Sequence, residues 1–181
     1  PGSGERRALD LWTFSYLSNG MNLKDLLRLR WRDVDFEAEK IYFIRAKTAR
    51  TKKSNQVKIW AVLFPQCREI IERNANPDRR PDAFVFPFLE AGLPAQQERD
   101  RIDVIIKTTN KWVKRVAAEV GITKPVTTYA ARHSFATVLM RNAAPVEFIA
   151  ERLGHSSIKT TKTYLDSFED EAAKKYLEVL T

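Results

Sequence analysis

The spacing of hydrophobic residues most constrains the fold of this chain, because it follows a helical period except in one stretch, where the period is two. Alternating residues in 34–36, 41–44 and 56–60 predict three short antiparallel strands. Strands and helices do not alternate along the chain, which argues against a Rossmann-like domain. We therefore expect an α+β fold that is mostly helical and holds one small three-stranded antiparallel sheet. Helices are predicted at about 6–17, 23–31, 65–74, 101–120, 128–142 and 146–153, with a short segment at 158–164.

The net charge indicates the kind of partner. The 181 residues are enough for one domain with its own core, and 31 Lys and Arg against 23 Asp and Glu give a formal net charge of +8. A folded domain with this excess of positive charge most often binds a polyanion, and nucleic acid is the leading candidate. The alternative is a basic surface that only keeps the protein in solution.

The basic residues are concentrated in one segment. Residues 45–58 hold six Lys and Arg and no acid, whereas residues 166–181 carry a net charge of −3 and an apolar stripe at helical spacing. We expect the basic segment to contact a nucleic-acid backbone, with a solvated hairpin tip as the alternative. The acidic tail is expected to be an amphipathic helix. The expected backbone contacts are Arg50, Lys52, Lys53 and Lys58.

Composition argues against several kinds of site. Cys67 is the only cysteine, which excludes an internal disulfide and a zinc site built from cysteines. With two histidines, His133 and His155, a histidine-rich metal site is not expected, and we predict no metal and no cofactor. No apolar run reaches the roughly 18 residues of a membrane span and no signal-peptide pattern is present, so we expect no membrane contact and a cytoplasmic location.

Arg132 is the most unusual charged residue. In the helix predicted at 128–142, Arg132, Phe135 and Leu139 share one face, so the arginine lies on or beside the apolar stripe. An unpaired charge is costly there, and the guanidinium therefore needs a partner. That partner is either a buried carboxylate or a bound anion such as phosphate, and from these residues alone the carboxylate is favoured.

Two stretches near the C-terminus resemble the catalytic domain of the tyrosine recombinases, the phage integrase family. They are TYAARHSFAT (128–137) and IAERLGHSSIKTTKTY (149–164). Arg132 matches the arginine of the family's His-x-x-Arg-His box, and His155 matches the histidine of its Leu-Gly-His motif. The resemblance makes Tyr164, nine residues after His155, the nucleophile.

The resemblance covers nearly the whole chain but departs from the family pattern at two positions. NGMNLKDLLRLRWRDVD (19–35) matches the first box, and RAKT (45–48) matches the segment with the sheet-borne lysine, here Lys47. The first-box arginine is replaced by Asn22, and the histidine of the second box is replaced by Tyr129. Gly-Met-Asn in this place is similar to the conjugative-transposon branch of the family.

Arg45 is our candidate for the missing cation. Arg45 and Lys47 are two residues apart in a predicted strand, so both side chains leave the same face. If Lys47 reaches the cleavage site, as the resemblance implies, Arg45 can approach the same phosphate. The alternative is that Arg45 is one more contact to the DNA backbone. Tyr129 can donate a hydrogen bond to a phosphate oxygen, although it does not titrate near neutral pH as histidine does.

The resemblance implies a site-specific recombinase or integrase that cleaves and rejoins DNA, for integration and excision of a mobile element. Tyr164 attacks a phosphodiester and forms a 3′-phosphotyrosine, while Arg132 and Arg45 hold the non-bridging oxygens. Lys47 protonates the departing 5′-oxygen, and His155 orients the phosphate or assists deprotonation of Tyr164. The alternatives are a type IB topoisomerase and a catalytically impaired DNA-binding module.

The resemblance also implies partners and a domain organisation. We expect double-stranded DNA attachment sites and other protomers of the same recombinase as partners, no small-molecule substrate, and a bacterial, nucleoid-associated location. Residues 5–181 are expected to be the catalytic domain, without the family's N-terminal core-binding domain. Residues 1–4 are interpreted as a flexible lead-in or a cloning remnant. The acidic tail, 166–181, is expected to dock on a neighbouring protomer or to fold back.

Overall fold

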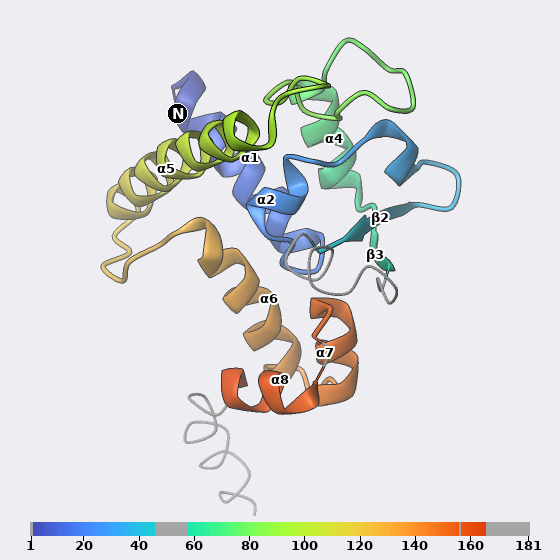
Figure 1. Cartoon of the computed structure of the whole chain (residues 1–181). Helices are drawn as coiled ribbons and strands as arrows, with labels where there is room; N and C mark the ends of the chain where they lie inside the picture. The colour runs from blue at the N-terminus through green and yellow to red at the C-terminus, as the bar shows by residue number, and fades with distance from the viewer. Residues whose placement is uncertain (1, 46–57, 156, 166–181) are drawn as a thin grey trace, which may run out of the picture.

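Helix α1 (Ser3–Leu17) is the element around which the other helices are arranged (Figure 1). The computed structural model describes residues 2–45, 58–155 and 157–165, with the backbone alone for 163–165. Within these ranges α1 contacts helices from the start, the middle and the second half of the chain. These helices are α2 (Leu23–Leu26), α4 (Pro65–Asn74), α5 (Ala95–Glu119) and α6 (Thr128–Arg141).

The sheet has the antiparallel topology that the alternating pattern predicts. Its strands are hydrogen-bonded in the order β1-β2-β3. Ile41 pairs with Ala61 and Phe43 pairs with Ile59, and these four side chains are all buried. The alternation with a period of two therefore arises because one face of the sheet packs against the core. The strands are β1 (Val34–Asp35), β2 (Lys40–Ile44) and β3 (Lys58–Val62).

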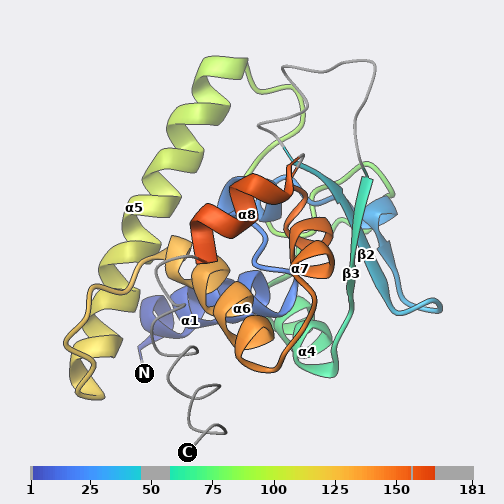
Figure 2. The same ribbon diagram turned by 90° about the horizontal axis from the view of Figure 1, so that it is seen from below.

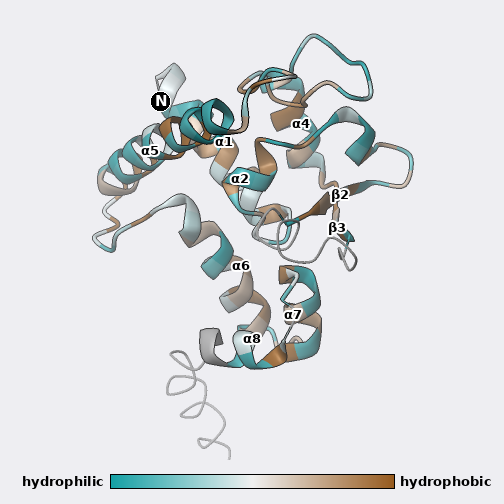
Figure 3. Ribbon diagram, viewed as in Figure 1, coloured by the Kyte–Doolittle hydropathy of each residue, from teal (hydrophilic) through white to brown (hydrophobic). Residues whose placement is uncertain are grey.

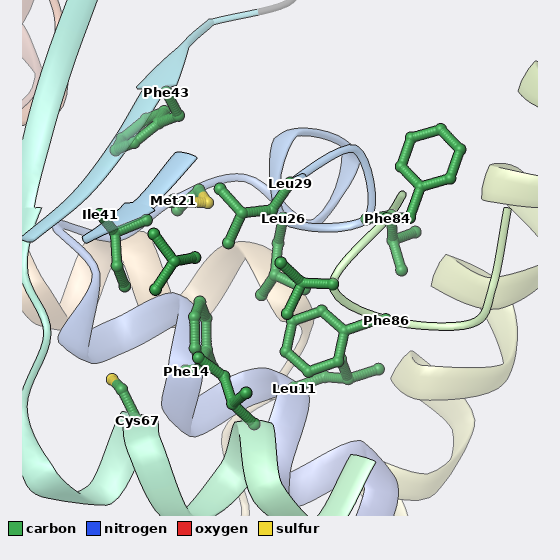
Figure 4. Packing of buried hydrophobic residues seen from close by; sticks show 14 of the residues in the cluster. Leu11, Phe14, Met21, Leu26, Leu29, Ile41, Phe43, Cys67, Phe84 and Phe86 are labelled. Carbon is green, nitrogen blue, oxygen red and sulfur yellow. The ribbon is translucent and has the colours of Figure 1, made fainter. Parts of the chain in front are cut away.

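The main hydrophobic core lies between α1, α2, α4 and the sheet (Figure 4). Phe14 of α1 is fully buried and meets Phe86 edge to face, with ring centroids 5.4 Å apart. Met21 and Leu26 close the core from the side of α2. Figure 3 shows the matching hydropathy, with hydrophobic colour on β2 and on parts of α1 and α4, and mainly hydrophilic colour along α5.

The C-terminal helices have a small core of their own. Helices α7 (Val146–Leu153) and α8 (Ile158–Leu165) follow α6, and the three form one group between α5 and the sheet (Figure 2). Ala136 of α6 packs with Ile149 and Leu153 of α7 in a cluster separate from the main core. This group contacts the main body through α1, α5 and β3, and most of these contacts join α6 to α1.

Several predicted boundaries are wrong for reasons of tertiary structure. The helix predicted at 23–31 ends at Leu26, and Trp31 begins a separate 3-10 helix, η1 (Trp31–Asp33). The Trp31 amide there donates to the carbonyl oxygen of Ala83, a contact that the local sequence does not reveal. Helix α1 begins at Ser3, three residues before its predicted start at about residue 6.

Helix α5 begins six residues before its predicted start at 101. Its first turns, AQQERD at 95–100, are polar and lack the hydrophobic period from which a helix is recognised. The other predicted helices agree with the structure closely. Pro65 is the first residue of α4, and Gly154 ends α7 in the left-handed conformation with φ +63°.

Candidate functional site

Arg132 lies at the junction between α6, α7 and the turn that joins α1 to α2. Its side chain is buried, with 3% of the residue exposed. Nη1 donates to the carbonyl oxygen of Gly20 at 3.1 Å, and Nη2 donates to the carbonyl oxygen of Leu153 at 2.5 Å. A carbonyl oxygen orients a guanidinium without removing its positive charge. The fold therefore holds a buried cation in a fixed orientation.

Gly20 allows the turn to approach α6 this closely. Its φ is +59°, a conformation that glycine adopts without strain, and a Cβ there would lie 2.7 Å from the Cα of Arg132. The preceding Asn19 donates from Nδ2 to the carbonyl oxygen of Trp60 at 2.8 Å. The turn is thus fixed to α6 on one side and to β3 on the other.

Arg45 reaches the same place from the end of β2. Its Nη1 donates to the carbonyl oxygen of Gly154 at 2.9 Å. Arg45 and Arg132 therefore bind consecutive carbonyl oxygens, those of Gly154 and Leu153, at the C-terminal end of α7. Carbonyl groups at a helix C-terminus lack partners within the helix and carry partial negative charge, so they attract cations.

His155 follows directly after these two carbonyl groups. Its Nε2 lies 3.2 Å from Nη2 of Arg132, and its Nδ1 lies 2.8 Å from the hydroxyl oxygen of Thr161 in α8. Its backbone amide donates to the carbonyl oxygen of Ala150 at 2.9 Å. The ring is thus held between α6 and α8.

The structure brings together three of the six predicted catalytic residues, Arg45, Arg132 and His155. Tyr164 belongs to α8, the helix that contacts His155, and its backbone alone is described. Lys47 lies outside the described residues, so its predicted position beside Arg45 is not tested. Strand β2 ends at Ile44, which places Arg45 just beyond the strand rather than within it.

Tyr129, the remaining predicted catalytic residue, lies at the start of α6. It is 51% exposed, and its ring meets the edge of the His133 ring at 4.6 Å between centroids. Tyr129 and Asn22 line one cleft of about 230 Å³ between the starts of α6 and α2. The two positions that depart from the family pattern are therefore neighbours in space.

Burial lowers the pKa of His133, and the positive charge of Arg132 lowers it further. The imidazole is therefore neutral near pH 7. The neutral His133 ring therefore places no second positive charge beside the buried guanidinium of Arg132. We expect His133 to serve as a packing partner of Tyr129.

Of the predicted DNA contacts, Lys58 is described, whereas Arg50, Lys52 and Lys53 lie outside the described residues. Lys58 begins β3 and is exposed, with Nζ 4.4 Å from the centre of the Tyr42 ring. It borders a cleft of about 440 Å³ whose lining includes several basic side chains. These side chains are Arg28, Arg30 and Arg32.

Across the described ranges, no three His, Cys, Asp or Glu side chains are grouped closely enough to hold a metal ion. None of the helices in this part of the chain combines the length and the apolar character needed to cross a membrane.

Sequence reasoning missed the groups that orient the cations. The carbonyl oxygens of Gly20, Leu153 and Gly154 leave no side-chain signal, since every residue has a carbonyl group. Gly20 and Gly154, both in the left-handed conformation, are the nearest available clue, because both occur inside the motifs. Thr161 was also missed, and a threonine in a helix has no sequence signature for contact with a histidine.

Comparison with known proteins gives one consistent result. The model of the phage integrase family matches residues 9–171. The tyrosine recombinase XerC of Xanthomonas axonopodis pv. citri is 27% identical over 161 residues, which cover 89% of this chain and 47% of that protein. A tyrosine recombinase of Thermosipho africanus is 27% identical over 159 residues, covering 86% of this chain and 50% of that protein. The chain thus spans about half the length of these curated relatives.

Solved structures share the fold at low sequence identity. The XerH site-specific recombinase bound to a palindromic difH substrate has a TM-score of 0.64 at 17% identity, covering 98% of this chain and 47% of that chain. The integrase of transposon Tn1549 in complex with transposon right end DNA has a TM-score of 0.63 at 19% identity, covering 97% of this chain and 59% of that chain. The mostly helical fold with a small antiparallel sheet is therefore that of the recombinase structures.

Proposed function

The chain belongs to the phage integrase family, and from this premise we propose that it is the catalytic part of a site-specific DNA recombinase. Its reaction is the cleavage and rejoining of double-stranded DNA through a 3′-phosphotyrosine. The likeness to the Tn1549 integrase supports a role in the integration and excision of a mobile element. Because its substrate is DNA, we place the protein at the nucleoid of a bacterial cell.

One observation carries this proposal. Arg132 and Arg45 donate to the consecutive carbonyl oxygens of Leu153 and Gly154, immediately before His155. Two permanent cations and an imidazole are thereby held at the end of one helix by contacts that fix their orientation. Groups oriented in advance stabilise charge that develops during a reaction without having to reorganise, which is what phosphoryl transfer requires.

The chemistry follows from this arrangement. The Tyr164 oxygen bonds to phosphorus as its phenol proton is released, and the bond from phosphorus to the 5′-oxygen breaks. Lys47 gives a proton to that 5′-oxygen, so a 5′-hydroxyl leaves. Arg132 and Arg45 hold the non-bridging oxygens, and His155 supports the phosphate or the deprotonation of Tyr164. The phosphotyrosine retains the energy of the phosphodiester, so rejoining needs no cofactor.

Arg45 takes the place of the missing first-box arginine in this proposal. Asn22 precedes α2 and has no charge with which to neutralise a phosphate. The Arg45 guanidinium binds the carbonyl group next to the one that Arg132 binds, so one phosphate can be reached by both. Tyr129, beside Asn22, donates a hydrogen bond where the family pattern has a histidine.

The partners in this proposal are attachment-site DNA and further protomers on the same DNA. Arg50, Lys52, Lys53 and Lys58 contact the DNA backbone. The acidic tail, 166–181, lies outside the described residues, and we propose that it docks on a neighbouring protomer. Its net charge of −3 is opposite to the positive charge of the rest of the chain, which supports such a contact.

A second candidate function rests on the cleft shared by Asn22 and Tyr129. The loss of two charged or titratable groups at one place favours a DNA-binding module with impaired catalysis. Covalent trapping separates the two functions. Nicked duplexes of randomised sequence are incubated with the protein, and the DNA that stays attached after denaturation with detergent is sequenced.

We expect the chain to retain a defined subset of these duplexes, and Tyr164→Phe to retain none while binding DNA as before. Tyr16→Phe is the matched control, since Tyr16 stacks on Trp12 at 5.7 Å between ring centroids, within α1. Retention by Tyr164→Phe contradicts the role of Tyr164. No retention by the unaltered chain favours the impaired module. A type IB topoisomerase would reseal only the original strand, whereas a recombinase joins the trapped end to a second duplex.

A further inference from the structure

We propose that Trp60 is a positioning residue that orients Arg132. It does so by fixing the relative positions of two carbonyl oxygens, those of Gly20 and Leu153, to which Arg132 donates. These oxygens come from separate segments, the turn after α1 and the end of α7. The inference rests on the proposed function only for its kinetic consequence, because the orientation of Arg132 is a property of the DNA-free protein.

The backbone of Trp60 holds the turn that carries Gly20. Among the described strands β3 lies at the edge of the sheet, where a strand has outward carbonyl groups that no neighbouring strand can bind. Asn19 donates from Nδ2 to the Trp60 carbonyl oxygen at 2.8 Å, and it is only 7% exposed. Its φ of +58° is left-handed, a conformation that asparagine tolerates better than most residues. The chain is therefore bound to β3 one residue before the Gly20 carbonyl group.

The ring of Trp60 holds the end of α7. Cζ of Arg152 lies over this ring, 4.2 Å from its centre, and Nη1 donates to the Trp60 carbonyl oxygen at 3.4 Å. The Phe148 ring, one turn earlier in α7, lies 5.3 Å from the same Cζ, and the Arg152 side chain is 11% exposed. Its ion pair with Glu151 stays within α7. Because Arg152 precedes Leu153, these contacts fix the end of α7 against β3 (Figure 2).

Packing in the core does not account for Trp60. The residue is 38% exposed, on the face of β3 opposite the buried Ile59 and Ala61. Its carbonyl group and its ring instead join the two segments that bind Arg132. A guanidinium is planar and its donors have fixed directions, so Arg132 can donate to both oxygens only while their spacing is kept. A displacement of about 1 Å at a reacting centre can slow a reaction about 100-fold.

The direct test measures the mobility of the Arg132 guanidinium in the DNA-free chain. Nuclear magnetic relaxation of its Nε–H group gives an order parameter, and the signal is assigned by its loss in Arg132→Lys. We expect a value near that of a rigid backbone, about 0.85, in the unaltered chain and in Trp60→Phe, which keeps an aromatic ring. In Trp60→Leu we expect a value below about 0.6. Asn19→Gly, which permits the same φ and removes the donor, should also lower it.

Phe36→Leu is the matched control. Cζ of Arg68 lies 5.4 Å from the centre of the Phe36 ring, and Nη2 donates to the Phe36 carbonyl oxygen at 2.7 Å. These are the same two kinds of contact that Arg152 makes with Trp60. Phe36 lies between β1 and β2 and Arg68 lies in α4, so this pair joins other elements. The order parameter of Arg132 should be unchanged in Phe36→Leu.

The kinetic arm uses single-turnover cleavage, at saturating protein, of a nicked duplex selected by covalent trapping. We expect Trp60→Leu to cleave about ten-fold slower or more, Trp60→Phe to recover most of the rate, and Phe36→Leu to cleave normally. If Trp60→Leu loses only DNA affinity, Trp60 is a DNA contact and the proposal is overturned.

The remaining outcomes separate this proposal from the proposed function. A mobile Arg132 guanidinium in the unaltered chain overturns the proposal, whether or not any Trp60 variant folds. An order parameter that is unchanged in folded Trp60→Leu also overturns it, and if that variant does not fold, Asn19→Gly provides the same test. Failure of the unaltered chain to cleave any DNA contradicts the proposed function, while the relaxation measurement still decides whether Trp60 orients Arg132.

Discussion

Arg45 and Gly154 are 109 residues apart in the sequence and are joined by a 2.9 Å hydrogen bond from the guanidinium to the carbonyl oxygen. Gly154 contributes to this contact in a second way. A Cβ on Gly154 would lie 2.9 Å from Cδ of Arg45 and 2.1 Å from Cδ1 of Ile59. The residue that ends α7 is therefore also the residue against which the Arg45 side chain packs.

Gly154→Ala should destabilise the protein and misplace Arg45. The alanine must adopt φ near +63° and displace Ile59, whose side chain is in the core. We expect a loss of about 3 kcal/mol or more in the free energy of unfolding, measured by denaturant titration. Gly92→Ala is the control, since Gly92 has φ +83° and no atom within 4 Å of its added Cβ. That variant should lose only the conformational cost, about 1 kcal/mol. Equal losses in the two variants would show that the contact with Arg45 and Ile59 is not tight.

Arg132→Lys tests whether orientation matters in addition to charge. Lysine keeps the positive charge but cannot span the carbonyl oxygens of Gly20 and Leu153 from one planar group. We expect single-turnover cleavage to fall about 100-fold or more, with a loss of about 1–2 kcal/mol in stability. Arg141→Lys, at an exposed position at the end of the same helix, is the control and should behave as the unaltered protein. Near-normal cleavage by Arg132→Lys would show that a point charge is sufficient.

Asp10 should make stability depend on pH in the acid range. Burial alone raises the pKa of Asp10, but hydrogen bonds from Arg73 and Asn74 outweigh burial and hold the pKa below its ordinary value. This stabilisation is present above the pKa of the unfolded carboxyl group, near 4, and is lost as the pH falls through the lower folded-state pKa. Asp10→Asn should therefore cost about 2 kcal/mol at pH 7 and flatten the decline in stability below pH 4.

The measurement for Asp10 is denaturant unfolding across a pH series. Asp103→Asn is the control, because the side chain of Asp103 is 56% exposed in its pair with Lys24. It should leave the pH series almost unchanged. If the stability of Asp10→Asn declined below pH 4 as steeply as that of the unaltered protein, the assignment of this pH dependence to Asp10 would be contradicted.

The sequence predicted those elements whose signals are local. The alternation of buried and exposed residues from Ile41 to Ile44 comes from the pleat of the strand itself. Pro65 and Gly154 mark helix ends through their own backbone preferences. Errors arose where a distant residue decides the outcome. One example is the contact of Gly4 with Trp112, which lies beside the first turn of α1.

The candidate site was predictable in its residue types but not in its connections. The apolar face around Arg132 predicted a buried arginine that needs partners, and the structure shows it buried at 3% exposure. Its two carbonyl partners come from segments 112 and 21 residues away, at separations that the chain topology alone sets. The proposal of Arg45 rested on strand periodicity, whereas the structure places Arg45 just beyond β2, and its contact with Gly154 depends on how α7 packs on β3.

The central claim is that Arg45 supplies the second cation to the scissile phosphate. It is tested most directly by single-turnover cleavage of a trapped nicked duplex at saturating protein, with Arg45→Ala compared with Arg50→Ala. The account predicts that Arg45→Ala cleaves slower by about 100-fold or more. Arg50→Ala should cleave at the normal rate once bound but bind DNA more weakly. The salt dependence of its DNA affinity should decrease by the amount that about one phosphate contact contributes. If Arg45→Ala cleaves at the normal rate under these conditions and loses only affinity, Arg45 is a backbone contact and the claim is wrong.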